Sequence, residues 1–405
     1  MDPLDVVLQV DEVEPHFQAI FSADSHEIIG YEVLGRLRQQ ERTISLGPFF
    51  HDANVPDDFK MEMDLKVQQL ALNYYMEQNI QQHLFLNIGA NYFATDTDDQ
   101  FLNQLLAYQE KGLDLSKIVI EIMGHQATSD IDSLSHTLKY LQTFGVKVVV
   151  DELGTGMSNV EDIMLMEPDI LKVDLEVLQN ESMSTSFHGI IHSLSLLARK
   201  LGAELLFNGI ASNYQFHYAW RNNGRYYQGD FLSEIKPHFL AVDVLKKRFR
   251  LDIQQFIEIE RTKLMAKYQL ARTLNQLISG KGKEVKKHRS LDEQVDYLAR
   301  GLEDIFFKVY VTDEDGFQKT VNLIYNEEEW EWDSLVKGKN WSWRPYFIEN
   351  VIRMKEEKTG ILSDLYNDIE TGERIRTFSY PLDSDYYLFM DISPMYLDDH
   401  EDLLW

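Results

Sequence analysis

No cysteine occurs among the 405 residues of the sequence. This absence excludes disulfide bonds and a thiolate nucleophile, and it suits a reducing compartment. Long apolar runs are missing too, because none approaches the ~18 residues of a membrane-spanning helix. Residues 1–5 also lack the basic region and the apolar core of a signal peptide. We therefore expect a cytoplasmic protein that has no membrane span.

Basic residues are scarce: 39 Lys and Arg oppose 67 Asp and Glu, which gives a formal net charge of −28. A protein this acidic repels the phosphate backbone, so we exclude DNA and RNA as general partners. One small dinucleotide held by metal ions and a few cationic side chains is still compatible with that charge. The 44% of apolar residues is enough for a full core, and the length predicts at least two domains.

A run of β-branched residues at 146–150 predicts a buried parallel strand that leads directly into Asp151 and Glu152. Two adjacent acids at the exit of an apolar strand repel each other and lose solvation. Either a divalent cation between them or the start of a helix would relieve this repulsion. This segment alone leaves both explanations open, metal ligation and a helix cap formed by Asp151.

The same succession of an apolar strand and a polar residue recurs along the first part of the chain. The polar residues that follow the successive strands are, in order, Glu32, Asn87, Glu121, Lys172 with Asp174 two residues later, Asn208 and Gln228. Amphipathic segments of helical length lie between these strands, for example residues 100–111, 131–144 and 187–201. About seven such repeats over ~240 residues predict an α/β fold, a TIM-type (β/α)8 barrel with its site at the carboxyl ends of the strands.

The polar residues at these strand ends predict a metal site. Oxygen ligands without histidine or cysteine favour Mg²⁺ or Mn²⁺ over Zn²⁺ and suit two-metal phosphodiester chemistry. Arg36, four residues after Glu32, is placed to clamp a ligand phosphate. Lys172 has a second interpretation, in which it only pairs with Glu121 or Asp151 in a structural network. The predicted metal ligands are Glu32, Asn87, Glu121, Asp151 and Glu152.

These residues resemble a known family. Residues 32–36, Glu-Val-Leu-Gly-Arg, are similar to the Glu-Ala-Leu signature of EAL domains, the barrels that bind and often hydrolyse cyclic di-GMP. The family's remaining blocks match Asn87, Glu121, residues 151–156, residues 172–174, and residues 228–229 followed by Pro237. The resemblance covers residues 1–240 and is strongest to YkuI-type EAL proteins of bacilli, which carry a C-terminal PAS-like domain.

The resemblance also implies roles for individual residues. It implies that Lys172 lies close to the attacking water and that Glu152 belongs to the catalytic pair. It implies a homodimer as well. The ligand-binding residues that it implies are Leu34, Arg36, Asp174, Gln228 and Pro237.

Four positions depart from the pattern of active EAL enzymes. Gly124 and Ala211 stand where the family has acids, and Glu152 replaces an aspartate. Asn208 replaces a carboxylate, and an amide cannot accept a proton at neutral pH. Lost charge at the second metal position leaves open whether one ion binds or two. A rewired site in which Glu152 or Glu204 substitutes for the lost base also stays open.

Three hypotheses follow from these departures. The first is a signalling protein that binds cyclic di-GMP and hydrolyses it slowly or not at all. The second is an active, metal-dependent phosphodiesterase gated by the C-terminal domain. The third is a protein-interaction scaffold without nucleotide binding, and the retained Arg36 and Gln228 weigh against it.

The remainder of the chain predicts a helical linker, 241–290, and a sensor domain, 291–405. Residues 242–278 contain neither proline nor glycine and predict one helix, which residues 279–282 would end. The basic cluster that follows, Lys281 to Arg289, predicts a solvated loop, with a contact to an anionic partner as the alternative. Helices at 291–305 and 347–357 and strands at 306–311, 320–325, 374–381 and 386–392 predict an α+β module.

Residues 340–347 resemble a segment of PAS-like and Cache-like domains. By this resemblance Arg344, Tyr346 and Asp364 line a pocket for an unknown small ligand. The alternative is that Arg344 and the aromatic residues around it fill a small core.

Overall fold

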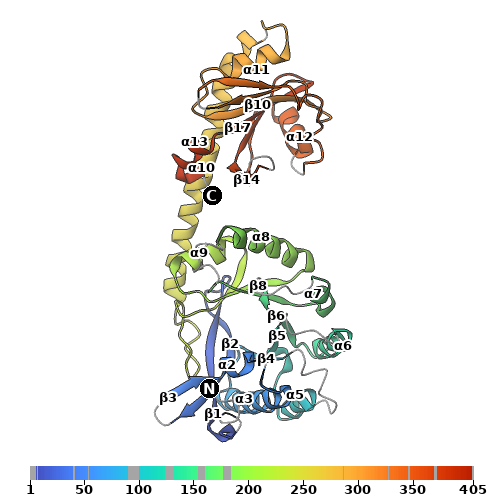
Figure 1. The fold of residues 1–405 in the computed structure, drawn as a ribbon. Helices are drawn as coiled ribbons and strands as arrows, with labels where there is room; N and C mark the ends of the chain where they lie inside the picture. The colour runs from blue at the N-terminus through green and yellow to red at the C-terminus, as the bar shows by residue number, and fades with distance from the viewer. Residues whose placement is uncertain are drawn as a thin grey trace. The chain divides into compact units, whose positions relative to one another are not determined.

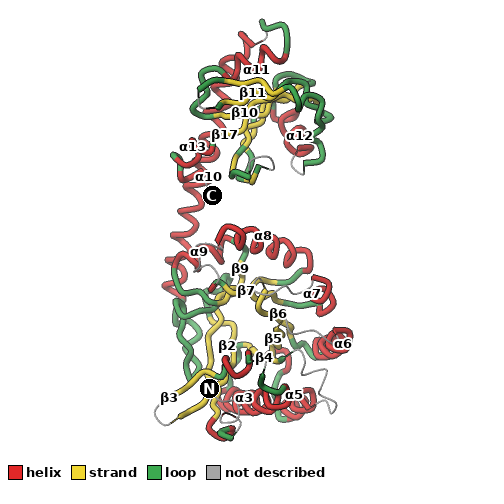
Figure 2. The backbone as a smooth tube through the Cα atoms, viewed as in Figure 1, coloured by secondary structure: helices red, strands yellow, loops and turns green. Residues whose placement is uncertain are grey.

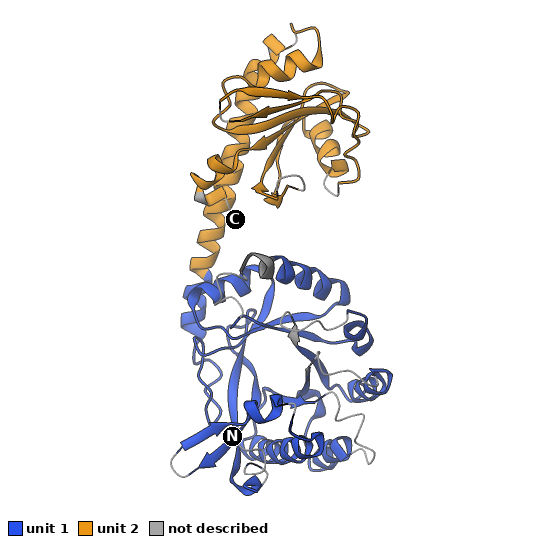
Figure 3. Cartoon of the chain, in the orientation of Figure 1, with its two compact units in different colours: residues 1–253 blue, residues 254–405 orange. Residues whose placement is uncertain are grey.

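The computed structural model describes residues 6, 8–39, 42–52, 54–89, 100–123, 131–153, 160–176, 184–285, 287–326, 328–344, 347–368 and 372–403. It consists of two compact units, residues 1–253 and residues 254–405 (Figure 3). Among the described residues no helix is long and apolar enough to span a membrane.

A closed eight-stranded barrel forms the first unit (Figure 1). Its strands are β1 (Val13–Ser22), β2 (Ile28–Gln39), β4 (His83–Ile88), β5 (Ile118–Met123), β6 (Lys147–Leu153), β7 (Ile170–Asp174), β8 (Glu204–Asn208) and β9 (Gly224–Tyr227). The ring closes because β1 pairs with both β2 and β9. The predicted TIM-type barrel is therefore confirmed.

Helices surround the barrel on its outer side (Figure 2). They are α3 (Asp57–Gln78), α5 (Gln100–Glu110), α6 (Ile131–Gln142), α7 (Val160–Met166), α8 (Ser184–Leu201) and α9 (Asn213–Arg221). The short helix α2 (Gly47–His51) lines the barrel cavity with Phe50 and His51. Strands β5 and β6 are apolar on both faces, because the helices bury one face and the barrel interior buries the other. The interior is filled by Ile20, Phe85, Val119, Val149, Ile170, Leu206 and Tyr226.

The first strand departs from the simple repeat, since β1 runs antiparallel to both of its neighbours. Strand β2 also continues beyond Glu32, where the sequence predicted its end. Parallel pairing with β4 stops at Glu32, whereas antiparallel pairing with β1 continues to Leu37 and the short strand β3 (Arg42–Ser45) pairs with the end of β2. Glu32 therefore still lies at the carboxyl edge of the parallel strands.

Helix α10 (Lys246–Val285) crosses the boundary between the units. The predicted end at residues 279–282 is wrong, because the helix passes through Gly280 and Gly282. Each glycine costs a helix ~1 kcal/mol, and packing outweighs that cost: Ile278 and Val285 are buried in the core of the second unit. Lys281, predicted in a solvated loop, lies in the helix, and its Nζ donates to the carbonyl of Leu298 at 3.1 Å.

The second unit is an α+β domain around a six-stranded antiparallel sheet. Its strand order is β12 (Trp330–Asp333), β11 (Asn322–Tyr325), β10 (Phe306–Asp313), β17 (Tyr386–Ile392), β16 (Thr377–Pro381), β13 (Ile361–Leu362). The short strands β14 (Tyr366–Asn367) and β15 (Arg374–Ile375) form a separate pair. The helices besides α10 are α11 (Leu291–Ala299), α12 (Phe347–Glu357) and α13 (Pro394–Asp398).

The elements of this domain follow the sequence expectation only in part. The strand predicted at 374–381 is divided into β15 and β16, and β13, β14 and α13 were not predicted. Helix α12 has the predicted bounds, whereas α11 stops at Ala299, six residues before the predicted end. Strand β12 was not predicted, although its four residues, Trp-Glu-Trp-Asp, alternate apolar and acidic side chains as a half-buried strand does. The PAS-like character of the domain stays a prediction.

Candidate functional site

Lys172 is the centre of a buried ionic cluster at the carboxyl end of the barrel strands. Its side chain, on β7, is 1% exposed. The ammonium Nζ lies 2.9 Å from Oε2 of Glu32, 2.7 Å from Oε2 of Glu121 and 3.2 Å from Oδ2 of Asp151. Strands β2, β5, β6 and β7 thus bring together four residues that are distant in the sequence. Both predicted partners of Lys172 pair with it at once.

Two amide side chains hold Glu32 in this cluster. Asn87 donates from Nδ2 to Oε1 of Glu32 at 2.9 Å, and Gln228 donates from Nε2 to Oε2 at 2.5 Å. Gln228 also donates to Oε1 of Gln18 at 2.9 Å. Sequence reasoning missed Gln18, because it lies within the antiparallel β1 and not at a strand end. The sequence marks Gln18 only as a polar residue within an apolar segment.

The buried charges shift one another's pKa values. Burial alone would raise the pKa of Glu32, but the charge of Lys172 and the hydrogen bonds from Asn87 and Gln228 hold it below its usual value. Burial, with the neighbouring Glu32 carboxylate, raises the pKa of Glu121 well above its usual range. Burial would lower the pKa of Lys172, yet the carboxylates outweigh it and raise that pKa. Lys172 is therefore a fixed cation.

The cluster fits a divalent cation in charge and in chemistry. Counted with all three carboxyl groups ionised, the cluster has a formal charge of −2 (−3 + 1), and the raised pKa of Glu121 reflects its burial and this uncompensated charge. Oε1 of Glu121 is buried and has no hydrogen-bond partner among the described residues. Buried oxygen donors with excess negative charge suit a hard cation. Among the described residues, however, no three acids or histidines stand in a metal-binding arrangement, because the ammonium of Lys172 occupies their centre.

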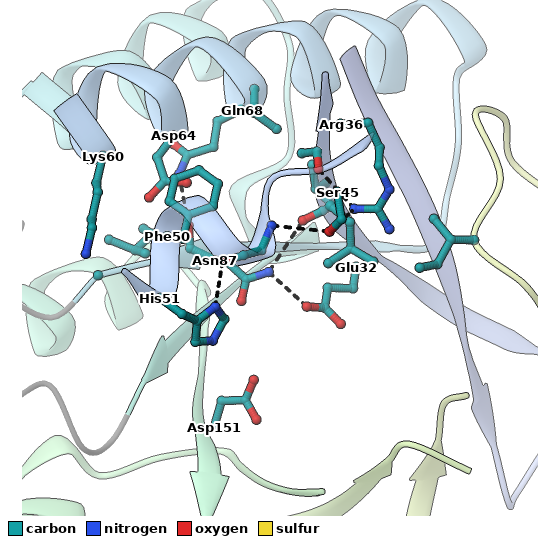
Figure 4. A pocket seen from close by; sticks show the side chains of 18 of the residues that line it. Glu32, Arg36, Ser45, Phe50, His51, Lys60, Asp64, Gln68, Asn87 and Asp151 are labelled. Atoms are coloured by element: carbon teal, nitrogen blue, oxygen red, sulfur yellow. Dashed lines mark hydrogen bonds between the residues drawn. The ribbon is translucent and has the colours of Figure 1, made fainter. Parts of the chain in front are cut away.

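A cavity of about 410 Å³ opens beside the cluster and is lined by predicted ligand-binding residues. Leu34, Arg36, Asp174 and Asn208 line it together with four residues of the ionic cluster and its support, Glu32, Asn87, Asp151 and Lys172. Figure 4 shows Glu32, Asn87 and Asp151 at the cavity. Asp174 and Asn208 are partners in the β7–β8 ladder, so the amide of Asn208 stands next to that acid. Neither Gln228 nor Pro237, both predicted to bind the ligand, is among the residues that line the cavity, whereas Ile235 is.

Arg36 is held at the cavity wall by weak partners only. Its Nη1 donates to the carbonyl of Gly35 at 2.9 Å and to Oγ of Ser45 at 3.3 Å. No carboxylate pairs with it among the described residues, although half-burial lowers its pKa and the charge of Glu32 raises it. An arginine bound by neutral groups retains most of its capacity to bind an anion such as a phosphate.

Helices α2 and α3 supply a wall of the cavity that sequence reasoning missed. Its side chains include Phe50, His51, Lys60, Asp64 and Gln68 (Figure 4). The signal for α3 was present in the sequence, because its lining residues recur every three or four positions on one helical face.

Several sequence predictions concern residues that the structure does not describe. The side chain of Glu152, residues 154–156, Gly124 and Tyr346 lie outside the described part of the chain. Glu204 is described, and it does not replace the lost base. It begins β8, at the end opposite to Asn208, and it pairs with Arg225.

The predicted C-terminal pocket stays a prediction, because Tyr346 lies outside the described residues. The side chain of Asp364 is 93% exposed and accepts a hydrogen bond from Lys267 at 2.5 Å. Arg344 is buried, and its guanidinium lies 4.6 Å from the ring of Trp341. This placement favours the alternative in which Arg344 and the aromatic residues form a small core.

Comparison with known families decides the family of this barrel. The model of the EAL domain matches residues 3–235, which is more than half of the chain. The chain belongs to the EAL-domain family. A second model, the EAL-domain associated signalling protein domain, matches residues 239–404.

Two relatives carry the comparison further. The EAL-domain protein YkuI of Bacillus subtilis (strain 168) is 42% identical over 406 residues, which is 100% of both chains. The crystal structure of B. subtilis YkuI, in complex with substrate cyclic di-GMP and calcium, superposes with a TM-score of 0.92 at 41% identity over 100% of both chains. An EAL domain protein from Listeria monocytogenes EGD-e, 22% identical over 58% of this chain and 94% of its own, shares the barrel with a TM-score of 0.51.

Proposed function

We propose that the barrel binds cyclic di-GMP at its mouth and hydrolyses it slowly or not at all. The observation that carries the proposal is the cavity beside the cluster of charge −2, which offers Arg36 to a phosphate. The structure of YkuI in complex with cyclic di-GMP and calcium supports the choice of ligand. A divalent cation, Mg²⁺ or Mn²⁺ by the prediction and Ca²⁺ in that relative, would neutralise the cluster and the phosphates together.

The residues retained and lost argue for binding over turnover. Glu32, Glu121 and Asp151 would hold the cation, which when bound would supply charge neutralisation and activation of water. Lys172 keeps the three carboxylates oriented and would attract a phosphate oxygen. Asn208 lines the cavity in place of an acid, and it cannot accept the proton of an attacking water. Loss of a general base costs ~10²–10⁴ in rate.

Turnover gated by the C-terminal domain is the second candidate. The observation that favours it is the complete set of Lys172, Glu121 and Asp151. Three further statements stay predictions: the homodimer, the cytoplasmic location and the PAS-like C-terminal sensor.

The test is a calorimetric titration of the full chain with cyclic di-GMP, with and without Mn²⁺ or Ca²⁺, followed by chromatography of the same samples. We expect binding with the nucleotide recovered intact. Rapid formation of the linear dinucleotide would replace the first candidate by the second. Absence of binding in every metal condition would overturn both and leave the scaffold hypothesis.

A further inference from the structure

Helix α2 ends with a histidine, His51, that the proposed function does not use. The side chain of Phe49 in this short helix is 3% exposed, so the helix is fixed against the barrel. The next two residues of the helix, Phe50 and His51, line the cavity. The dipole of a helix favours a positive charge at its last residue, which is the position of His51. The chain therefore places a side chain that can accept a proton on the cavity wall.

A hydrogen bond fixes the orientation and the tautomer of the His51 ring. Its Nδ1 lies 2.7 Å from the carbonyl oxygen of Gly47. Because a carbonyl oxygen only accepts, Nδ1 carries the hydrogen, and Nε2 is the proton-accepting atom of the neutral ring. General bases in enzymes are held in the same way, by a third group that orients the base. The ring of His51 is thus prepared to accept a proton at Nε2.

His51 shares the cavity with Asp151, a predicted cation ligand. Both residues line the cavity, and Figure 4 shows the ring of His51 between the side chains of Asn87 and Asp151. The side chain of Asp151 is 15% exposed, and its Oδ2 lies 3.2 Å from Nζ of Lys172. A water molecule between the two residues would donate one hydrogen to the Asp151 carboxylate and the other to Nε2 of His51. In this arrangement a base can take the proton of an attacking water.

The carboxylates of the cavity are less suited to this proton transfer. Glu32 and Asp151 pair with the ammonium of Lys172, and a neighbouring positive charge makes a carboxylate a weaker base. Asp64, whose pKa burial raises, lies on α3 across the cavity from Asp151 (Figure 4). His51 is the one histidine among the described residues that line the cavity, and histidine is the side chain that exchanges a proton near neutral pH.

We propose that His51 is the general base of a slow hydrolysis of the bound cyclic dinucleotide. The proposal rests on the proposed function and deepens it. Nε2 takes a proton from the water while the water oxygen forms a bond to a phosphorus atom of the ligand. The bond from that phosphorus to one ribose oxygen breaks, and the ribose oxygen takes a proton from solvent. His51 then gives its proton to solvent, so the neutral ring is restored and the product is the linear dinucleotide.

The test measures binding and hydrolysis of cyclic di-GMP by the full chain at constant free Mn²⁺. For the wild type we expect slow, steady formation of the linear dinucleotide. His51→Gln keeps a donor for the Gly47 carbonyl but cannot accept a proton, so it should lower the rate at saturating ligand by about 10². His51→Ala should lose as much, and added imidazole should restore part of the rate, because it can occupy the space of the deleted ring. His192→Gln, which changes an exposed histidine of α8, is the matched control and should alter neither rate nor affinity.

The outcomes separate this inference from the proposed function. A wild type that does not bind cyclic di-GMP overturns the proposed function. A wild type that binds it and forms no linear product within a day overturns the role of His51 alone, and this result needs no variant to fold. A wild-type rate in His51→Gln also overturns that role while binding stands. So does a lost rate that imidazole fails to restore in a His51→Ala protein that still binds the ligand.

Discussion

Each unit of the chain buries a lysine among acids, and the two clusters differ in a way that identifies the site. In the barrel, Lys172 faces three carboxylates within 3.2 Å and the cluster borders a cavity. In the second unit, Lys308 lies 3.7 Å from Asp368 and 3.8 Å from Asp391. Arg344 adds a second positive charge that acts on Asp391, so that cluster is formally neutral (+2 − 2).

The difference shows that a buried charge by itself does not make a binding site. Burial raises the pKa of Asp391, while Lys308, a hydrogen bond from Thr377 and Arg344 offset part of that rise. The C-terminal cluster is thus balanced by the chain's own side chains and behaves as a structural network. The barrel cluster keeps a formal charge of −2 and borders a cavity.

The largest expected effect comes from removing each lysine. Lys172→Met should destabilise its unit by about 3–5 kcal/mol in chelator, because three carboxylates are left buried together. Millimolar Mn²⁺ or Ca²⁺ should restore most of that loss, because the cation replaces the ammonium. Lys308→Met should destabilise the second unit without any rescue. Urea unfolding with and without cation measures both, and equal rescue of the two variants would contradict the comparison.

The next largest effect, on the rate of hydrolysis, is expected from adding a negative charge beside the ionic cluster of Lys172. Asn208→Glu restores a carboxylate on the cavity wall, so hydrolysis of cyclic di-GMP should accelerate by about 10². Chromatographic time courses in Mn²⁺ measure the linear product, with Asn222→Glu, outside the cavity, as control. A wild type that already hydrolyses rapidly, or a variant no faster than wild type, would show that Asn208 does not limit turnover.

Arg36 and Arg38 allow a charge that borders the cavity to be compared with a charge that is paired at the surface, within one strand. Both lie on β2, two residues apart, but only Arg36 lines the cavity, and Arg38 forms an exposed pair with Glu12. Arg36→Ala should weaken cyclic di-GMP binding about 10- to 100-fold, the loss of a charge-assisted phosphate contact. Arg38→Ala should leave the affinity unchanged. Equal losses in the two titrations would mean that long-range charge, and not contact, carries the binding.

The smallest effect is expected at the exposed ion pair of the second unit. Asp364→Asn removes the partner of Lys267, and exposed pairs contribute about 0–1 kcal/mol. Thermal unfolding should therefore change little. A large shift in the melting temperature, or altered binding of a small ligand to the C-terminal domain, would support the prediction that Asp364 lines a pocket.

Residues that act at strand ends were predictable from sequence, and residues that act through tertiary packing were not. The apolar strands before Glu121, Asp151 and Lys172 carry their own signal, and parallel strands must bring their ends together. Gln18 gave no such signal, since its role depends on the antiparallel pairing of β1. The continuation of α10 through Gly280 depends on packing in the second unit, which overrides helix propensity. The sequence was sufficient to reject Glu204 as a replacement base, because Glu204 begins its strand and the site lies at the opposite, carboxyl end.

Hydrogen–deuterium exchange of the full chain with and without cyclic di-GMP, in Mn²⁺ or Ca²⁺, tests the central claim most directly, because it observes both units at once. The claim that the open, charged barrel mouth is the ligand site predicts slower exchange at residues 32–36 and 57–68 and at the end of β4. Strands β10 and β17, which surround the balanced cluster, should exchange unchanged. Unchanged exchange at the barrel mouth, or protection confined to β10 and β17, would contradict the account.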